Sequence, residues 1–233
     1  AARARLQVQR RAEVSFPAFR QSGRRASMEP SPSPPLPIFE ARKGKIELGQ
    51  DHVTFRFLGT EELVARPIDW RPARYQKGTR LWLLNPHYME YLEELSDRDC
   101  LQLMVEWVKH TPPFQAGFWR DNWNSYSLSI RVVVWMQQLA KRRDVSSAPP
   151  QIMNSLRDQL LFLDRHLETD IGGNHLIKNI KALIWGGRFF AGDEAARLFS
   201  KGESLLRTQL RRQILDDGMH YELTPAYHRQ VFV

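Results

Sequence analysis

The sequence predicts a mainly α-helical fold of antiparallel helical hairpins, with a short β element near residues 50–60. Three observations lead to this prediction. From residue 81 onward, apolar residues recur at the spacing of one helix face, and the clearest stripe consists of Leu156, Leu160, Leu163 and Leu167. Capping residues and prolines stand where these stretches begin. The links between them are mostly short, so successive helices should pair as hairpins.

The predicted helices occupy most of the chain after residue 81. They cover residues 85–95, 97–110, 125–143, 150–168, 174–190, 193–215 and 224 onward. Polar residues at the start of a helix accept hydrogen bonds from its first N–H groups, and proline fits the first turn because it has no N–H to leave unpaired. On this basis the start signals are Asn85-Pro86, Ser96 or Asp97, Pro149-Pro150, Asn174 and Thr224-Pro225.

Composition divides the chain into three parts. Residues 1–45 form a basic, Pro/Ser-rich leader that has little to bury and is expected to be disordered or loosely docked. Residues 46–80 form a strand and loop lead-in, in which Val53 to Gly59 alternates in character like a strand or a hairpin arm. Residues 81–233 form the helical domain.

The net charge of +8 is concentrated in the leader. Ten Arg and Lys residues against three Glu give residues 1–45 a net charge of +7, so the rest of the chain carries only +1. We therefore predict no nucleic-acid binding by the helical domain. No run approaches the roughly 18 apolar residues that span a bilayer, which predicts no membrane span. The single cysteine, Cys100, excludes an internal disulfide and a cysteine-based metal site.

Two segments carry polar side chains at predicted helix starts. The first runs from Gly172 through Asn174 and His175 to Asn179, and the second, Asp217 to His228, adds two His, one Glu and two Tyr. Both are expected to face one side of the fold and to suit proton-transfer chemistry on a polar substrate. Taken alone, the first segment is better explained as a capping Asn beside a core histidine that is hydrogen-bonded to the backbone. The second segment favours the functional interpretation.

Three stretches, in order, resemble the helical domain of the heparinase II/III and alginate lyase type of polysaccharide lyases. In the third stretch the chain departs from the family pattern, with Met219 where a second Gly is common and Thr224 where Ser is common. Leu81 to Tyr88 is also similar to the family's domain start. The three stretches are Trp-x-x-Tyr-x-x-Ser-x-Arg at Trp123 to Arg131, Gly173-Asn174-His175-Leu176, and Asp217 to His228.

The resemblance implies an (α/α) toroid whose groove holds an acidic polysaccharide, followed in the family by a β-sandwich domain. Against that pattern the chain is expected to be an incomplete toroid that stops at Val233 and is inactive alone. The implied reaction is β-elimination beside a uronic acid. By resemblance, Asn174 neutralises the uronate carboxylate and Tyr227 delivers a proton to the leaving glycosidic oxygen.

Eight further residues are expected to bind substrate, through charge, hydrogen bonds or stacking on sugar rings. Two of them have structural alternatives, Arg131 as a salt-bridge partner on its helix and Glu222 as a surface residue. Trp135 and Trp185, which sit within apolar helices, are better explained as core aromatics. The eight are His175, Glu222, His228, His220, Arg131, Tyr126, Trp123 and Trp119.

No cofactor is predicted, and no metal ligands are assigned because no His pair has the i, i+4 spacing of familiar zinc motifs. A structural calcium or zinc ion beyond Val233 is left open. The predicted partner is an acidic polysaccharide, and the oligomeric state is not indicated. The resemblance implies the periplasm or cell envelope; no signal sequence is recognisable in residues 1–45, and the cytoplasm is the alternative. The runner-up function is a non-catalytic helical toroid that binds a glycan or partner in a polysaccharide or capsule system.

Overall fold

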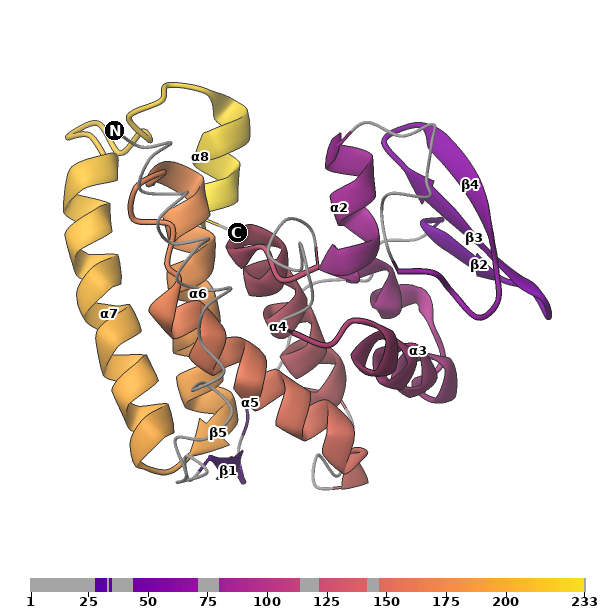
Figure 1. Cartoon of the computed structure of the whole chain (residues 1–233). Coiled ribbons are helices and arrows are strands. Elements are labelled where there is room, and N and C mark those ends of the chain that lie inside the picture. The colour runs from indigo at the N-terminus through magenta and orange to yellow at the C-terminus, as the bar shows by residue number, and fades with distance from the viewer. Residues whose placement is uncertain are drawn as a thin grey trace.

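Helices form most of the described part of the computed structural model of this chain, and the predicted mainly helical class is confirmed (Figure 1). The structure describes residues 28–32, 34, 44–70, 80–113, 122–141 and 147–232. In the last helix it describes only the backbone of residues 226, 227, 230 and 232.

The elements follow the order expected from the sequence, with strands mainly first and helices after them. The strands are β1 (Glu29–Pro30), β2 (Ile46–Leu48), β3 (His52–Phe57), β4 (Thr60–Ala65) and β5 (Phe190–Ala191). The helices are α2 (Arg80–Tyr88), the 3-10 helix η3 (Glu90–Glu94), α3 (Asp97–His110), α4 (Ser125–Ala140), α5 (Pro150–Arg165), α6 (Gly173–Phe189), α7 (Asp193–Gln213) and α8 (Pro225–Phe232). No helix among these described elements is both long and apolar enough to cross a membrane.

The β element predicted near residues 50–60 is an antiparallel three-stranded sheet in the order β2-β3-β4. Leu58 and Gly59 both have positive φ, 54° and 75°, as a tight two-residue hairpin turn requires. The Phe55 ring centre lies 5.2 Å from that of Tyr91, and Phe57 lies 5.6 Å from Trp82. The sheet therefore packs on α2 and η3.

The first predicted helix is organised differently from the expectation. Asn85-Pro86 was expected to open it, but both residues lie inside α2, which ends at Tyr88. Met89 has a left-handed φ of 57° and separates α2 from η3. Proline has no N–H to donate to the carbonyl oxygen four residues earlier, and α2 ends two residues after Pro86. The Asn85 side-chain amide donates to the Leu81 carbonyl oxygen at 2.8 Å and so satisfies a neighbouring acceptor.

The starts of α3 and α4 are capped by side chains. Ser96 accepts a hydrogen bond from the Asp99 N–H at 3.2 Å, which confirms the predicted cap. Asn124 accepts from the N–H groups of Tyr126 and Ser127. Helix α4 is buried on nearly all sides because α2, η3, α5 and α6 contact it. Its predicted end at Arg143 lies outside the described residues.

Helices α6 and α7 form the closest helical hairpin of the fold and run antiparallel side by side (Figure 1). Gly187 permits this approach, because a Cβ atom at this position would lie 2.6 Å from the Ala195 carbonyl oxygen and from Phe199. Helix α8 begins at Pro225 as predicted, with the His228 N–H donating to the Thr224 carbonyl oxygen at 3.0 Å. It packs on α6, so the chain returns to the start of that helix.

A short part of the predicted leader is docked on the helical domain. Strand β1 pairs with β5, the Ser31 N–H donates to the Phe189 carbonyl oxygen at 2.8 Å, and Arg157 Nε donates to the Met28 carbonyl oxygen. Met28 is 1% exposed. The leader was expected from composition to be disordered or loosely docked, and within it residues 28–32 are held by long-range pairing. Most of the remaining leader lies outside the described residues.

Replacing Met28 with alanine is expected to lower the free energy of unfolding by about 2 kcal/mol, since a buried thioether side chain is lost. Urea unfolding monitored by circular dichroism measures this change. Glu29→Ala is the matched control, because Glu29 is exposed and its change should stay within about 0.5 kcal/mol. Equal midpoints for Met28→Ala and the wild type would show that the segment is not packed in solution.

Candidate active site

The two polar segments singled out in the sequence meet at the N-terminal end of α6. Gln213 Nε2 donates to the Gly173 carbonyl oxygen at 3.4 Å. A Cβ atom at Gly173 would lie 3.5 Å from the Tyr221 hydroxyl and 3.6 Å from Glu222 Oε1. The loop after α7 therefore folds back over the first residues of α6, and α8 follows beside the same helix (Figure 1).

Glycine, rather than the predicted Asn174, occupies the cap position of α6. Gly172 has φ 69° and ψ −147°, and Gly173 has φ 51°, conformations that residues with a Cβ rarely adopt. The Gly172 N–H donates to the Glu168 carbonyl oxygen at 2.9 Å, which closes the link from α5. Asn174 is the second residue of the helix and half-buried. Its side chain still belongs to the helix mouth, where backbone N–H groups favour an anion.

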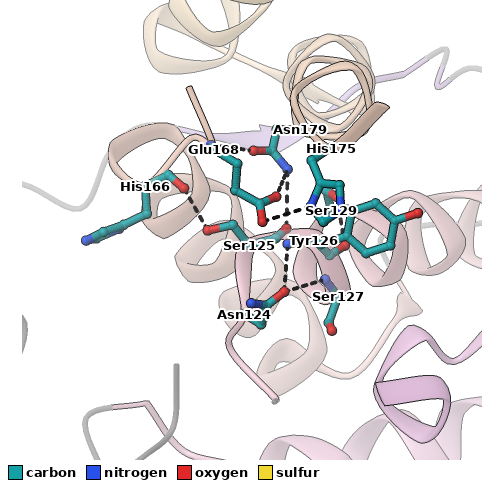
Figure 2. Close-up of polar contacts among 9 residues, drawn as sticks. All are labelled: Asn124, Ser125, Tyr126, Ser127, Ser129, His166, Glu168, His175 and Asn179. Atoms are coloured by element: carbon teal, nitrogen blue, oxygen red, sulfur yellow. Dashed lines mark hydrogen bonds and ion pairs between the residues drawn. The ribbon is translucent and has the colours of Figure 1, made fainter. Parts of the chain in front are cut away.

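A buried carboxylate, Glu168, organises the residues below this mouth (Figure 2). Its Oε1 lies 3.1 Å from His175 Nδ1, and its Oε2 accepts from Asn179 Nδ2 at 3.1 Å. The Glu168 N–H in turn donates to Asn179 Oδ1 at 2.8 Å. Asn179 is fully buried and also lies 3.5 Å from the Ser125 carbonyl oxygen. Asn179 thus connects three parts of the fold, which are the link after α5, helix α4 and helix α6.

The start of α4 supplies the aromatic side of the site. The Tyr126 ring centre lies 4.3 Å from that of His175, with 36° between the planes. Ser125 Oγ donates to the His166 carbonyl oxygen at 2.6 Å and ties the start of α4 to the end of α5. Tyr126 and His175 are both half-buried, so part of this ring pair is accessible at the surface.

Tyr88, at the end of α2, packs behind Tyr126 with ring centres 6.0 Å apart. Its hydroxyl is buried and has no hydrogen-bond partner among the described residues. Burial raises the pKa of Tyr88 well above its ordinary value, and the nearby groups Tyr126, Glu90 and Glu168 raise it further. Tyr88 therefore stays neutral and is a structural neighbour of the site.

His220 is an internal residue, although it was expected to bind substrate. It is 0% exposed, and its Nε2 lies 3.0 Å from Gln213 Oε1. Its Nδ1 accepts from the Glu222 N–H at 3.4 Å, which assigns the ring proton to Nε2. The His220 N–H donates to His228 Nδ1 at 3.3 Å. These bonds hold the loop between α7 and α8, so His220 positions Glu222 and His228.

Arg131 does not bind substrate from its position in this structure, because it is 0% exposed within the central helix α4. Its Nε donates to Gln159 Oε1 at 2.7 Å, its Nη1 donates to the His87 carbonyl oxygen at 2.9 Å, and its guanidinium lies 4.0 Å from the Trp107 ring centre. Burial lowers the pKa of Arg131 well below its ordinary value. No acidic side chain among the described residues forms the salt bridge considered from the sequence, and the buried guanidinium presents no surface to a sugar.

Trp123, which was assigned to sugar stacking, is also not at the surface. Trp123 is 3% exposed, donates from Nε1 to the Thr111 carbonyl oxygen at 2.9 Å and packs edge-on against Phe162. Trp119 lies outside the described residues. Trp135 is fully buried, as its core alternative predicted.

Of the two residues assigned to catalysis, Asn174 lies at the α6 mouth, and Tyr227 lies in α8 with its side chain outside the description. Beside this mouth the rings of His175 and Tyr126 are in contact, and Glu222 lies over Gly173. His228 accepts a hydrogen bond from the His220 N–H of the loop that covers the mouth. Sequence reasoning missed Glu168, because the link after α5 has no periodic pattern to mark an inward-facing residue. The described residues contain no group of three or more His, Cys, Asp or Glu side chains placed to hold a metal ion.

Most of the helical part of the chain matches a known protein family. The family described as Heparinase II/III N-terminus matches residues 84–232, well over half of the chain. The chain belongs to this family. A heparin-sulfate lyase from Pedobacter heparinus is 31% identical over 144 residues, which are 58% of this chain and 21% of that protein.

Solved structures show the same fold. A mutant of heparan sulfate lyase HepC from Pedobacter heparinus superposes with a TM-score of 0.59 at 19% identity, covering 77% of this chain and 31% of that one. HepC itself gives a TM-score of 0.54 at 20% identity with the same coverage. The chain thus spans about a fifth of the curated relative and about a third of the solved structures.

Proposed function

We propose that this chain is the helical part of a polysaccharide lyase that cleaves a uronate-containing anionic glycan by β-elimination. Its membership of the heparinase II/III family supports the class of reaction. The names of its relatives, lyases of heparin sulfate and heparan sulfate, support an acidic polysaccharide substrate. The observation that carries the proposal is the meeting of the Gly173–His175 segment with the 217–228 segment at the mouth of α6.

The chemistry requires that a base remove a very weakly acidic proton from the carbon next to a carboxylate, after which the bond to the leaving glycosidic oxygen breaks and a carbon–carbon double bond forms. The reaction therefore needs donors that neutralise the carboxylate as charge develops. In the proposed mechanism the Asn174 amide donates two N–H groups to it, and the positive end of α6 adds its own field. An uncharged donor suits this role because no counter-charge has to be desolvated with it.

The second requirement is a proton for the leaving glycosidic oxygen, and we assign its delivery to Tyr227. A phenol with an ordinary pKa of about 10 carries its proton at neutral pH, so it is a ready donor. The position of α8 beside α6 supports this assignment at the level of the backbone. His175, Tyr126, Glu222 and His228 would then contact the sugars on either side of the cleaved bond.

The proposal is tested by incubating the complete protein with a panel of acidic glycans. Elimination creates a 4,5-unsaturated uronate that absorbs in the ultraviolet, so turnover is followed continuously by absorbance. A glycan that binds tightly without forming the chromophore would overturn the lyase proposal in favour of a non-catalytic binding toroid.

Within that assay, Asn174→Ala is expected to reduce turnover about a hundredfold, which corresponds to roughly 3 kcal/mol of lost transition-state stabilisation. Binding should weaken less, because the amide contacts the carboxylate before and during the reaction but more strongly as charge develops. Asn154→Ala is the control, since Asn154 is exposed on α5 and outside the site. Wild-type turnover in Asn174→Ala would remove Asn174 from the mechanism.

A further inference from the structure

The carboxylate of Glu168 uses both of its oxygens inside the protein. It is 9% exposed, with Oε1 at 3.1 Å from His175 Nδ1 and Oε2 at 3.1 Å from Asn179 Nδ2 (Figure 2). The orientation of the Asn179 amide is set independently, because its Oδ1 accepts the Glu168 N–H at 2.8 Å. The NH₂ group of Asn179 must therefore face the carboxylate.

The hydrogen-bond donors and acceptors around Glu168 then determine which nitrogen of the His175 ring carries the proton. An ionised carboxylate has acceptors only, so the hydrogen between Oε1 and Nδ1 belongs to the imidazole. In a neutral imidazole the other nitrogen, Nε2, then carries the lone pair. Stacking on Tyr126 limits rotation of the ring, and 35% of the His175 side chain is exposed. Nε2 is the nitrogen that remains for a substrate.

We infer that Glu168 is a positioning residue that holds His175 in the Nδ1–H tautomer, so that Nε2 accepts a hydrogen bond from a sugar hydroxyl. The role of this contact in turnover rests on the proposed function, whereas the tautomer itself does not. Glu168 contacts no substrate in this scheme. It acts through His175, much as a buried carboxylate orients an imidazole in other proton-transfer sites.

Glu168→Gln tests the tautomer with almost no change of shape. The new carboxamide has one acceptor and one donor group. The carboxamide oxygen must still accept a hydrogen bond from the Asn179 NH₂ group, because the backbone N–H of residue 168 fixes the direction of that group. The carboxamide NH₂ group therefore faces His175 Nδ1. Nδ1 then has to accept, and the ring proton moves to Nε2. Asp170→Asn removes the same charge from an exposed position in the same link and serves as the control.

The measurement is a long-range ¹H–¹⁵N spectrum of the 233-residue chain labelled with ¹⁵N-histidine, recorded at mildly alkaline pH. His175 signals are identified by their loss in His175→Gln. We expect Nδ1–H in the wild type and in Asp170→Asn, and Nε2–H in Glu168→Gln. A wild-type spectrum that shows the His175 proton on Nε2 would overturn the inference. A folded Glu168→Gln protein in which the proton stays on Nδ1 would also overturn it. The wild-type arm remains decisive even where the variant does not fold.

An activity arm separates this inference from the proposed function. In the complete protein, Glu168→Gln is expected to lower kcat/KM about 10- to 100-fold, the range for residues that orient a functional histidine, with Asp170→Asn unchanged. A switched tautomer with full turnover would overturn the positioning role. Absence of elimination in the wild type would overturn the proposed function and leave the tautomer assignment standing.

Discussion

Tyr227→Phe is expected to lower elimination by the complete protein about 10²- to 10⁴-fold, while glycan affinity changes by no more than a few-fold. The phenol hydroxyl is assigned to proton transfer, an interaction that develops only in the transition state. Phenylalanine differs from tyrosine only by the lost hydroxyl. The loss should therefore fall on kcat rather than on KM. Single-turnover absorbance on the cleaved glycan measures the chemical step directly.

Tyr91→Phe is the matched control for this substitution. The Tyr91 hydroxyl donates to the Pro86 carbonyl oxygen at 2.9 Å inside the core, so its loss should reduce stability by about 1 kcal/mol and leave turnover nearly unchanged. A Tyr227→Phe protein that retains more than about a tenth of the wild-type rate falls outside the range for a lost acid–base group. In that case another residue delivers the proton.

The helical fold could be predicted from the sequence because its strongest signals are local. The stripe of Leu156, Leu160 and Leu163 is buried as its spacing required, and the caps at Ser96 and Pro225 stand at real helix starts. The failures arise where two local rules compete. Pro86 was interpreted as a helix start, but proline also breaks helices, and here α2 ends two residues after it.

The candidate site was less predictable, because residue type does not reveal exposure. Arg131 has a chemistry that suits a uronate, yet Ile130 precedes it and Val132 follows it in a helix surrounded by other helices. That apolar setting was the available signal for burial. Glu168 shows the opposite case, since only the folding of the link against α6 turns a polar loop residue into the centre of a network.

Long-range pairing explains the remaining difference. Residues 28–32 have the composition of a leader, but β5, more than 150 residues later, supplies the strand that they pair with. Composition reports only what a segment can bury by itself. The partner of an edge strand lies elsewhere in the chain, and no local window contains it.

Acid is expected to destabilise this domain through His87, at a pH where most carboxylates are still ionised. His87 is 1% exposed and accepts a hydrogen bond at Nδ1 from Trp107 Nε1 at 3.2 Å. Burial and, to a lesser extent, the neighbouring Arg131 guanidinium together lower the pKa of His87 to about 3. Among the described residues, no acid forms an ion pair with either side chain. A charged His87 would therefore stand beside a buried cation without compensation.

The sign of the effect follows from proton binding. Unfolding returns the His87 pKa to about 6.5, so between that pH and about 3 the unfolded chain binds a proton that the folded chain excludes. Stability should be constant with respect to this group above about pH 6.5 and should fall as the pH is lowered towards 3. The shift corresponds to a loss of roughly 5 kcal/mol at most.

Urea unfolding at intervals from pH 8 to pH 4 measures this loss, and two variants identify its source. His87→Asn keeps an acceptor for Trp107 but cannot be protonated, so it should be less stable at pH 8 and lose much less stability on acidification. His110→Asn removes an exposed histidine and should retain the wild-type pH dependence. If His87→Asn loses stability with acid as steeply as the wild type, the proton is bound elsewhere, because the only titratable group removed was the buried imidazole.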